Sequence, residues 1–186
     1  MALEELLAQT ETRFKKAIDA LKHDVATVRT GRAAPSLVEQ LEVEAYGVPT
    51  PLIQLAQINA PEPRLLTVQP FDPSSLPTIE RTIQESDLGL TPSNDGKIVR
   101  LPIPQLTEER RKELVKVARQ MAEDGRVAIR NVRRDVMHHL KELVDKGEVG
   151  SDEEHRAEER VQKLTDDHTH KIDDLLRRKE EEILEV

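Results

Sequence analysis

The stretch RVAIRNVRRDVMHHL, residues 126–140, carries two different stripes at the spacing of one helix. At about 100° per residue, five apolar side chains fall on one face: Ile129, Val132, Val136, Leu140 and Leu143. Four arginines form a second stripe about a quarter-turn away, called the arginine stripe below: Arg126, Arg130, Arg133 and Arg134. The pattern therefore predicts a helix with one face for packing and one cationic face open to solvent.

This helix extends in both directions before the sequence interrupts it. Thr107 is predicted as its N-cap, because two glutamates follow in the first turn. Gly147 and Gly150 interrupt the pattern after Lys146. The predicted helix has roughly 40 residues and a length of about 60 Å.

Two further segments have helical periodicity and no proline. In residues 3–30 apolar side chains recur at steps of three and four, and Gly31 is predicted to cap this helix in a left-handed conformation. Ser151 with Glu154 predicts a capping box that opens the last helix. The apolar stripe of that helix is Ala157, Val161, Leu164, Ile172, Leu175, Leu176 and Ile183. None of the three buries enough surface alone, which predicts an elongated three-helix bundle.

The prolines mark an insertion between the first two helices. All eleven lie between Pro35 and Pro104, and proline breaks helix interiors. We therefore expect an α+β fold with a three-helix domain of residues 1–30 and 107–186 and an inserted domain of residues 31–106. The two junctions form a predicted hinge of Thr30, Gly31, Gln105 and Leu106.

The inserted segment has the pattern of a small β/α/β domain. Residues 41–47 alternate apolar and polar side chains, as a half-buried strand does. Three more strands are expected between proline-rich turns, at residues 52–58, 64–71 and 97–103. Pro102 is expected at the edge or end of its strand, because it cannot donate a ladder hydrogen bond. The spacing of Leu76, Ile79 and Ile83 predicts a short helix that stops before Gly89.

The composition points to a protein of the cytoplasm. Of the 186 residues, 34% are charged and 2% aromatic, which suits long helices with solvated outer faces. The absence of cysteine excludes disulfides and thiolate metal sites. The first residues include two glutamates where a signal peptide needs basic residues, and no stretch has the length of a membrane span. A soluble cytoplasmic protein is expected.

Charge is distributed unevenly along the chain, whose formal net charge is −8. Residues 107–146 contain 11 basic and 8 acidic residues, a net charge of +3, whereas residues 147–186 have 7 and 14, a net charge of −7. The arginine stripe could bind RNA phosphates, or could be a solvated face that pairs with the acidic last helix. Arginine favours the first interpretation, because its guanidinium binds phosphate bidentately. Arg29 and Arg32, beside the hinge glycine, form a second basic group.

The sequence offers no site for catalysis, a metal or a cofactor. Residues 89–98 lack the spacing of a phosphate-binding loop and predict a turn before the last strand. His168 and His170 diverge at i, i+2 on a helix, so a solvated face is expected for both, and the adjacent His138 and His139 also diverge. No Ser or His is placed as a nucleophile with its base.

Four motifs resemble those of ribosome recycling factors in the same order and spacing, over essentially the whole chain: VRTGRAAPSL, SDLGLTPSNDG, LTEERRKELVK and EDGRVAIRNVRRD. The resemblance implies a three-helix bundle with a hinged β/α/β insert, in an L-shaped two-domain arrangement similar in outline to a transfer RNA. One departure is Gln105, where family members usually have a second proline, and it bears on the stiffness of the hinge.

The resemblance also implies a function. Such factors bind the post-termination ribosome on the large subunit and, with elongation factor G and GTP, split the subunits and release messenger RNA. They are monomers without enzymatic activity, cofactor or membrane contact. The family's RNA-contacting residues match Arg29, Arg32, Arg130 and Arg133. With their neighbours, the candidate residues for binding ribosomal RNA are Arg29, Arg32, Arg126, Arg130, Asn131, Arg133 and Arg134.

Two alternatives belong to other functional classes. A coiled-coil adaptor or chaperone that binds protein helices would use the same bundle but would not need the arginine stripe. A metallo-hydrolase built on the histidines is the third hypothesis.

Overall fold

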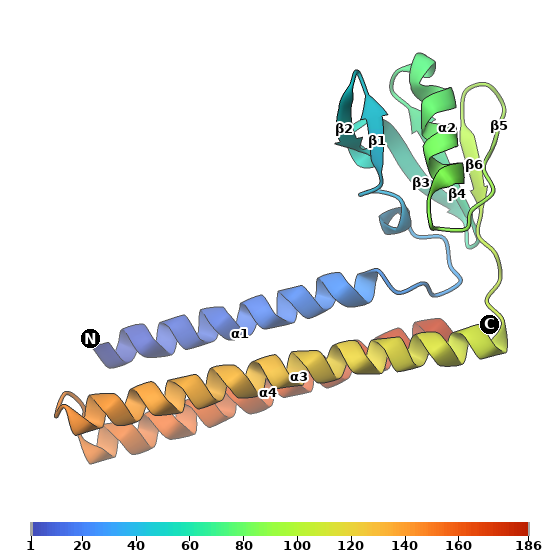
Figure 1. Cartoon of the computed structure of the whole chain (residues 1–186). Coiled ribbons are helices and arrows are strands. Elements are labelled where there is room, and N and C mark those ends of the chain that lie inside the picture. Colours follow the sequence, from blue (N-terminus) through green and yellow to red (C-terminus); the bar gives the residue numbers. More distant parts are fainter. Residues whose placement is uncertain (1, 186) are drawn as a thin grey trace. The chain divides into compact units, whose positions relative to one another are not determined.

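A computed structural model describes residues 2–185 and has the expected α+β fold. The chain divides into two compact units, one formed by residues up to Val28 and from Lys112 onward, the other by Arg29–Arg111. The first unit contains three long helices, and the second contains the sheets and one shorter helix (Figure 1).

The three-helix unit consists of α1 (Ala2–Ala26), α3 (Glu108–Asp145) and α4 (Ser151–Leu184). In Figure 1, α3 runs antiparallel to α1 and α4. Most of the apolar side chains predicted to face the core are buried, among them Phe14, Ile18, Ile129, Val132, Val136, Leu140, Val161, Ile172 and Ile183. Leu143, Leu164, Leu175 and Leu176 are partly buried. Burial of these seams holds the helices together, because no single amphipathic helix can cover its own apolar face.

Helix α3 begins as predicted, whereas α4 does not. Thr107 Oγ1 accepts a hydrogen bond from the Arg110 backbone N–H at 3.1 Å, so Thr107 is the N-cap. Gly147, with φ of +73°, ends α3 as expected. The predicted capping box of Ser151 is wrong, because the N-cap is Gly150, which has no side chain to accept a capping hydrogen bond. The extended Gly150 allows the chain to turn directly from α3 into α4, so Ser151 already lies in the helix.

Helix α1 ends earlier than predicted, at Ala26 instead of Thr30. The Thr27 hydroxyl and backbone N–H both donate to the Asp24 carbonyl, at 2.6 and 3.1 Å. Such i, i+3 contacts tighten and close the last helical turn. Gly31 therefore does not cap α1, although it does have the predicted left-handed backbone, with φ of +78°.

Replacing Gly31 with valine is expected to lower stability by about 1–2 kcal/mol, because a left-handed residue with a Cβ is strained. The new Cβ would also lie 3.4 Å from Leu106 Cγ. Urea unfolding measures the loss. Gly89→Val is the matched comparison: Gly89 has φ of +68° and nothing within 4 Å of its Cβ position, so it should show the loss from backbone strain without the contact to Leu106. Wild-type stability for Gly31→Val would contradict this account of the backbone.

His168 is the largest departure from the predicted helix faces. The expected solvated position is wrong: His168 is only 3% exposed, and its ring stacks on Phe14 with centroids 5.0 Å apart. Its Nδ1–H donates to the Leu164 carbonyl at 2.6 Å, and its buried Nε2 has no hydrogen-bond partner among residues 2–185. The physical reason is phase, because His168 lies three and four residues from Thr165 and Ile172 on the buried stripe. His170 faces solvent as expected.

The second unit contains two antiparallel sheets. Strands β1 (Glu42–Ala45) and β2 (Val48–Pro51) form a hairpin, and a four-stranded sheet has the order β3-β4-β6-β5. The strands of that sheet are β3 (Ala56–Glu62), β4 (Leu65–Pro70), β5 (Ser93–Asn94) and β6 (Val99–Pro102). Helix α2 (Leu76–Glu85) follows β4, and short 3₁₀ helices span Pro35–Leu37, Leu52–Gln54 and Pro73–Ser75.

Most of the predicted strands are present. The first, third and fourth correspond to β1, β4 and β6, and Pro102 is the last residue of its strand. The expected strand at 52–58 begins only at Ala56, because Leu52–Gln54 forms a 3₁₀ turn. Strands β2 and β5 were not predicted.

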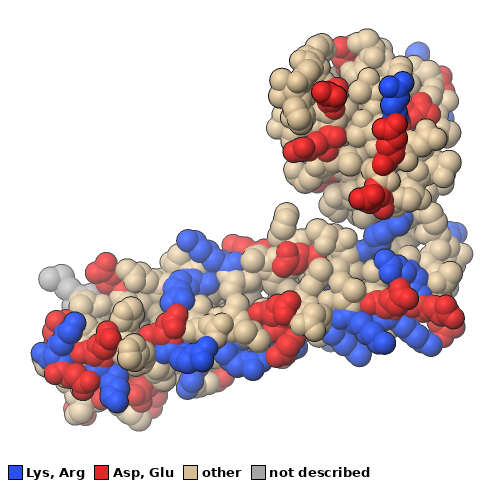
Figure 2. Space-filling view, viewed as in Figure 1, with Lys and Arg blue, Asp and Glu red and all other residues tan. Residues whose placement is uncertain are grey.

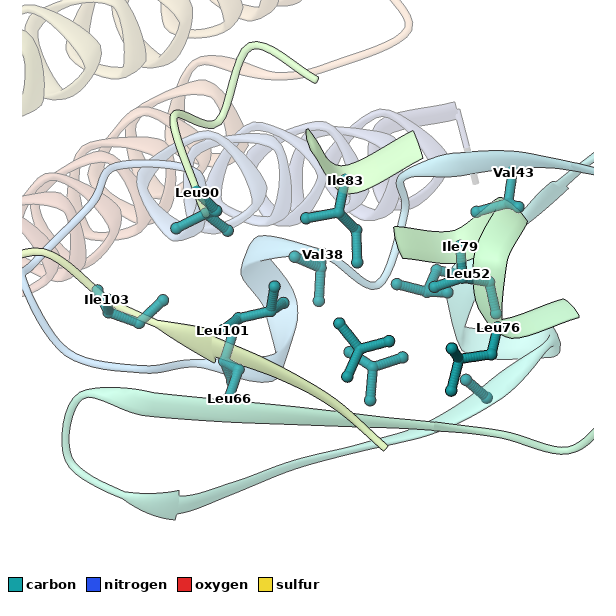
Figure 3. Close-up of a cluster of buried hydrophobic side chains, with 13 residues drawn as sticks. Val38, Val43, Leu52, Leu66, Leu76, Ile79, Ile83, Leu90, Leu101 and Ile103 are labelled. Carbon is teal, nitrogen blue, oxygen red and sulfur yellow. The ribbon is translucent and has the colours of Figure 1, made fainter. Parts of the chain in front are cut away.

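A separate core fills the second unit. Helix α2 places Leu76, Ile79 and Ile83 against the sheet side chains, as the spacing predicts (Figure 3). Leu66 and Leu101 pair across β4 and β6 and are fully buried. At about 25 cal/mol per Å² of apolar area, such a cluster gives this unit its own driving force for folding.

The predicted turn before the last strand is confirmed. Asn94 Oδ1 accepts from the Gly96 backbone N–H at 3.0 Å, and Asp95 Oδ1 accepts from Lys97 and Ile98 at 3.0 and 2.8 Å. These contacts lower the pKa of Asp95, with the backbone N–H of Ile98 as the largest cause. The backbone donors of this turn are therefore used within the turn.

Candidate nucleic-acid interface

The arginine stripe lies on α3, and its four side chains have different environments. The side chain of Arg126 is 26% exposed and that of Arg130 is 62% exposed. Figure 2 shows basic and acidic side chains interspersed along the three-helix unit, so the partners of each arginine decide how much positive charge it presents.

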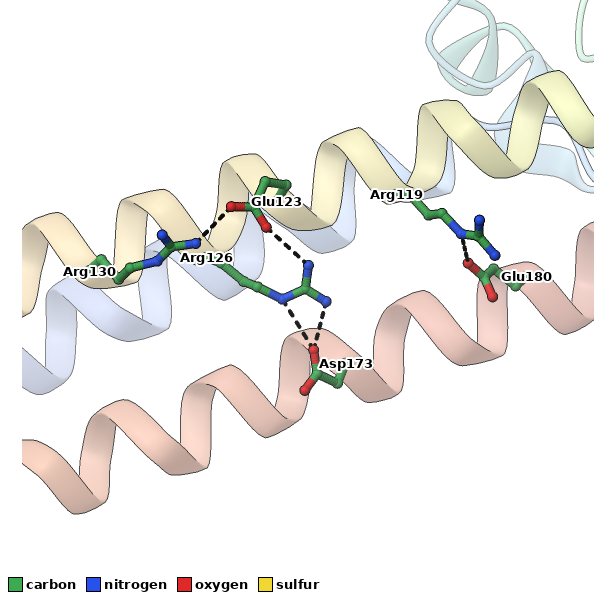
Figure 4. Close-up of polar contacts among 6 residues, drawn as sticks. All are labelled: Arg119, Glu123, Arg126, Arg130, Asp173 and Glu180. Atoms are coloured by element: carbon green, nitrogen blue, oxygen red, sulfur yellow. Dashed lines mark hydrogen bonds and ion pairs between the residues drawn. The ribbon is translucent and has the colours of Figure 1, made fainter.

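Arg126 is held between α3 and α4. Its Nη2 and Nε donate to Asp173 Oδ1 at 2.7 and 3.2 Å, and its Nη1 donates to Glu123 Oε2 at 3.3 Å (Figure 4). The hydrogen bond to Asp173 is the main reason that the pKa of Arg126 is raised. The expectation of a cationic face open to solvent is therefore wrong for Arg126, because the acidic α4 supplies a carboxylate beside it.

Glu123 also holds Arg130. Arg130 Nη2 donates to Glu123 Oε1 at 2.7 Å, so one carboxylate bridges two members of the arginine stripe (Figure 4). Hydrogen bonds from Arg130 and then Arg126 lower the pKa of Glu123. This exposed pair orients Arg130, but it contributes little to stability in water.

Arg133 and Arg134 have uncharged partners. Arg133 Nε donates to Gln162 Oε1 at 3.0 Å, and Arg134 donates to the side-chain oxygen of Asn131. A neutral amide orients a guanidinium without cancelling its charge. The strongest uncompensated positive charge of the arginine stripe therefore lies toward its C-terminal end.

The remaining candidate residues belong to the other unit, Arg29–Arg111. Arg29 Nη1 donates to the Leu88 carbonyl at 3.1 Å, and Arg32 also has a polar or electrostatic partner. Gly31 has Leu106 against its Cβ position. The structure thus groups the arginine stripe in one unit and the hinge residues in the other.

The sequence did not identify the partners of the arginine stripe. Glu123, Asp173 and Gln162 decide the charge and orientation of its members, yet two of them lie on α4, far away in the sequence. The periodicity of α4 shows that Gln162 lies next to its buried stripe, but no sequence pattern shows which residue of α3 faces Gln162.

The described residues contain neither a candidate metal site nor a candidate membrane span. No group of three or more histidine, aspartate or glutamate side chains among residues 2–185 could hold a metal ion. In the same part of the chain, no helix has both the length and the apolar character that crossing a bilayer requires.

Comparison with known proteins links these features to one family. A family model described as "Ribosome recycling factor" matches residues 21–184. Curated relatives named ribosome-recycling factor include one from Rubrobacter xylanophilus, 57% identical over 97% of both chains. Another, from Chloroflexus aurantiacus, is 50% identical over 99% of this chain and all of the relative.

Two solved structures are similar over nearly the full chain. A solution structure of a ribosome recycling factor has a TM-score of 0.81 and 40% identity, and covers 100% of this chain and 99% of its own. The second has a TM-score of 0.70 and 49% identity, and covers 99% and 100%. It is described as models for the T. thermophilus ribosome recycling factor and the E. coli elongation factor G bound to the E. coli post-termination complex.

Proposed function

Because this chain belongs to the ribosome recycling factor family, we propose that it binds the post-termination ribosome and, with elongation factor G and GTP, splits the subunits and frees them from messenger RNA. The observation that carries the proposal is the match of the family over residues 21–184, which includes the whole arginine stripe. The chain itself is not an enzyme in this mechanism, and the GTPase supplies the free energy.

The proposed binding surface for ribosomal RNA of the large subunit is the arginine stripe together with Asn131 and the two hinge arginines, Arg29 and Arg32. Arg133 and Arg134 are suited to phosphate because their partners are neutral amides, and Arg130 because its side chain is 62% exposed. Arg126 lies at the edge of this surface and also secures α3 against α4.

The domain organisation is part of the same proposal. The three-helix domain of residues 1–30 and 107–186 docks on the large subunit, and the inserted domain of residues 31–106 makes a second contact. The hinge of Thr30, Gly31, Gln105 and Leu106 allows the two domains to move, and the L-shaped arrangement stays a prediction. The chain acts as a cytoplasmic monomer without a cofactor.

Light scattering of ribosomes tests this function directly. Purified bacterial ribosomes with an empty acceptor site are mixed with the chain, elongation factor G and GTP. Scattering should fall as the subunits separate, and omission of either the chain or GTP should abolish the fall. Equal rates with and without the chain would contradict the proposal.

A coiled-coil adaptor or chaperone is not favoured by the family match. Sedimentation with purified subunits separates the two hypotheses, because a recycling factor should co-sediment with the large subunit in a salt-dependent manner. An adaptor should remain at the top of the gradient.

A further inference from the structure

Helices α3 and α4 are joined by ion pairs that repeat every seven residues. Arg119 Nε lies 2.7 Å from Glu180 Oε1, and Arg126 Nη2 lies 2.7 Å from Asp173 Oδ1 (Figure 4). Positions seven residues apart lie on one side of a helix, because seven residues make about two turns. These two pairs form an ion-pair ladder along the antiparallel helices.

The next step of the ion-pair ladder leads to Arg133 on α3 and Asp166 on α4, but these two residues are not paired. Arg133 Nε donates instead to Gln162 Oε1 at 3.0 Å, and Gln162 Nε2 donates to Asp166 Oδ1 at 2.9 Å. Within residues 2–185 the Arg133 side chain makes no other hydrogen bond or ion pair. Gln162 therefore stands between an arginine and the carboxylate that the ladder would give it.

The orientation of the Gln162 amide follows from its neighbours. A carboxylate accepts only, so the NH₂ end must face Asp166, and the oxygen is left for the Arg133 N–H. The contact occupies Nε–H and leaves both terminal NH₂ groups of Arg133 for another acceptor. The guanidinium is held in place while its donors remain available.

Arg133 and Arg126 therefore differ in how far their partners compensate the positive charge. Asp173 and Glu123 compensate the Arg126 guanidinium, so an incoming phosphate would compete with two carboxylates. At Arg133 the partner is neutral, so a phosphate meets a full positive charge in a fixed orientation.

We propose that Gln162 is a positioning residue that keeps Arg133 out of the ion-pair ladder and orients it toward a phosphate of ribosomal RNA. This inference rests on the proposed function, since it names how one arginine of that binding surface is kept competent. Gln162 itself need not touch RNA.

Binding to purified large subunits across a salt series tests the role of Gln162. In Gln162→Ala the spacer is lost, and Arg133 should pair with Asp166 as Arg126 pairs with Asp173. One phosphate contact contributes about 0.7–0.9 to the log–log salt slope, so the slope should fall by about that amount. Relative to the wild type, affinity should then fall about five- to eightfold more at 0.1 M than at 1 M salt.

A second substitution distinguishes positioning from a structural role. In Gln162→Ala/Asp166→Asn the competing carboxylate is gone, so the slope and affinity should return to wild-type values. Gln162→Glu should lower the slope as Gln162→Ala does, because it places a carboxylate directly on Arg133. Gln120→Ala is the matched control, since Gln120 donates to Asp124 four residues on at 2.9 Å, as Gln162 does to Asp166, and its slope should not change.

Each contrary outcome has a definite meaning. A wild-type slope in Gln162→Ala, or no rescue by Asp166→Asn, would overturn the inference and leave the proposed function intact. Wild-type chain that shows no salt-dependent binding to large subunits would overturn the proposed function and this inference together. Thermal melts of every variant accompany the titrations.

Discussion

Loss of both Arg130 and Arg133 is expected to lower the salt slope of large-subunit binding by about 1.4–1.8, taking 0.7–0.9 for each phosphate contact. This corresponds to about 25- to 60-fold in affinity for each tenfold change in salt. Each neutralised phosphate releases a counterion, so removal of the arginines removes that release. The measurement is a salt titration of Arg130→Ala/Arg133→Ala beside the wild type.

The same double variant should remain folded. Arg130 is 62% exposed and its ion pair with Glu123 lies on the surface, where a pair contributes at most about 1 kcal/mol. Arg156→Ala/Arg160→Ala removes the same charge from exposed positions on α4 and serves as the control. A coiled-coil adaptor predicts the opposite pattern, with an unchanged slope and a large fall in melting temperature. That result would contradict the proposal that the arginine stripe binds RNA.

Replacing Phe14 with alanine is expected to destabilise the three-helix unit by about 3–5 kcal/mol. The Phe14 side chain has no exposed surface, and its ring stacks on His168 with centroids 5.0 Å apart. The truncation removes buried apolar area, leaves a cavity, and removes the ring that stacks on His168. Urea unfolding followed by circular dichroism gives the loss.

The chain supplies a matched control in its second phenylalanine. Phe71 is 67% exposed, so Phe71→Ala removes the same side chain at little cost and should change stability by less than about 0.5 kcal/mol. Equal losses for the two variants would show that the bundle core around Phe14 is not packed as described.

Much of the architecture follows from the sequence alone. The confinement of all eleven prolines to residues 35–104 predicts an insert between helices, because proline is excluded from helix interiors. The periodicity of α3 correctly predicts its buried face, and Thr107 its first turn, since both depend only on neighbours within one helix. The four family motifs can also be recognised from the sequence alone, because each is one continuous stretch of residues.

Helix ends and polar residues on apolar stripes were harder to predict. The sequence suggests that Gly31 ends α1, but the Thr27 hydroxyl closes the helix first. The polarity of His168 and its separation from His170 predict a solvated position, although its phase with Thr165 and Ile172 places it in the core. In each case a competing local interaction or the position on the stripe outweighed residue type.

The tertiary structure alone decided which arginines have their charge compensated by a carboxylate of the neighbouring helix. Arg119, Arg126 and Arg133 follow one another at a spacing of seven residues. Arg126 nevertheless contacts Asp173, whereas Arg133 contacts Gln162. Periodicity fixes the face of a helix on which a side chain lies, but not the register of the neighbouring antiparallel helix. That register depends on how the buried side chains of α1, α3 and α4 interlock, and it places an aspartate beside Arg126 and an amide beside Arg133.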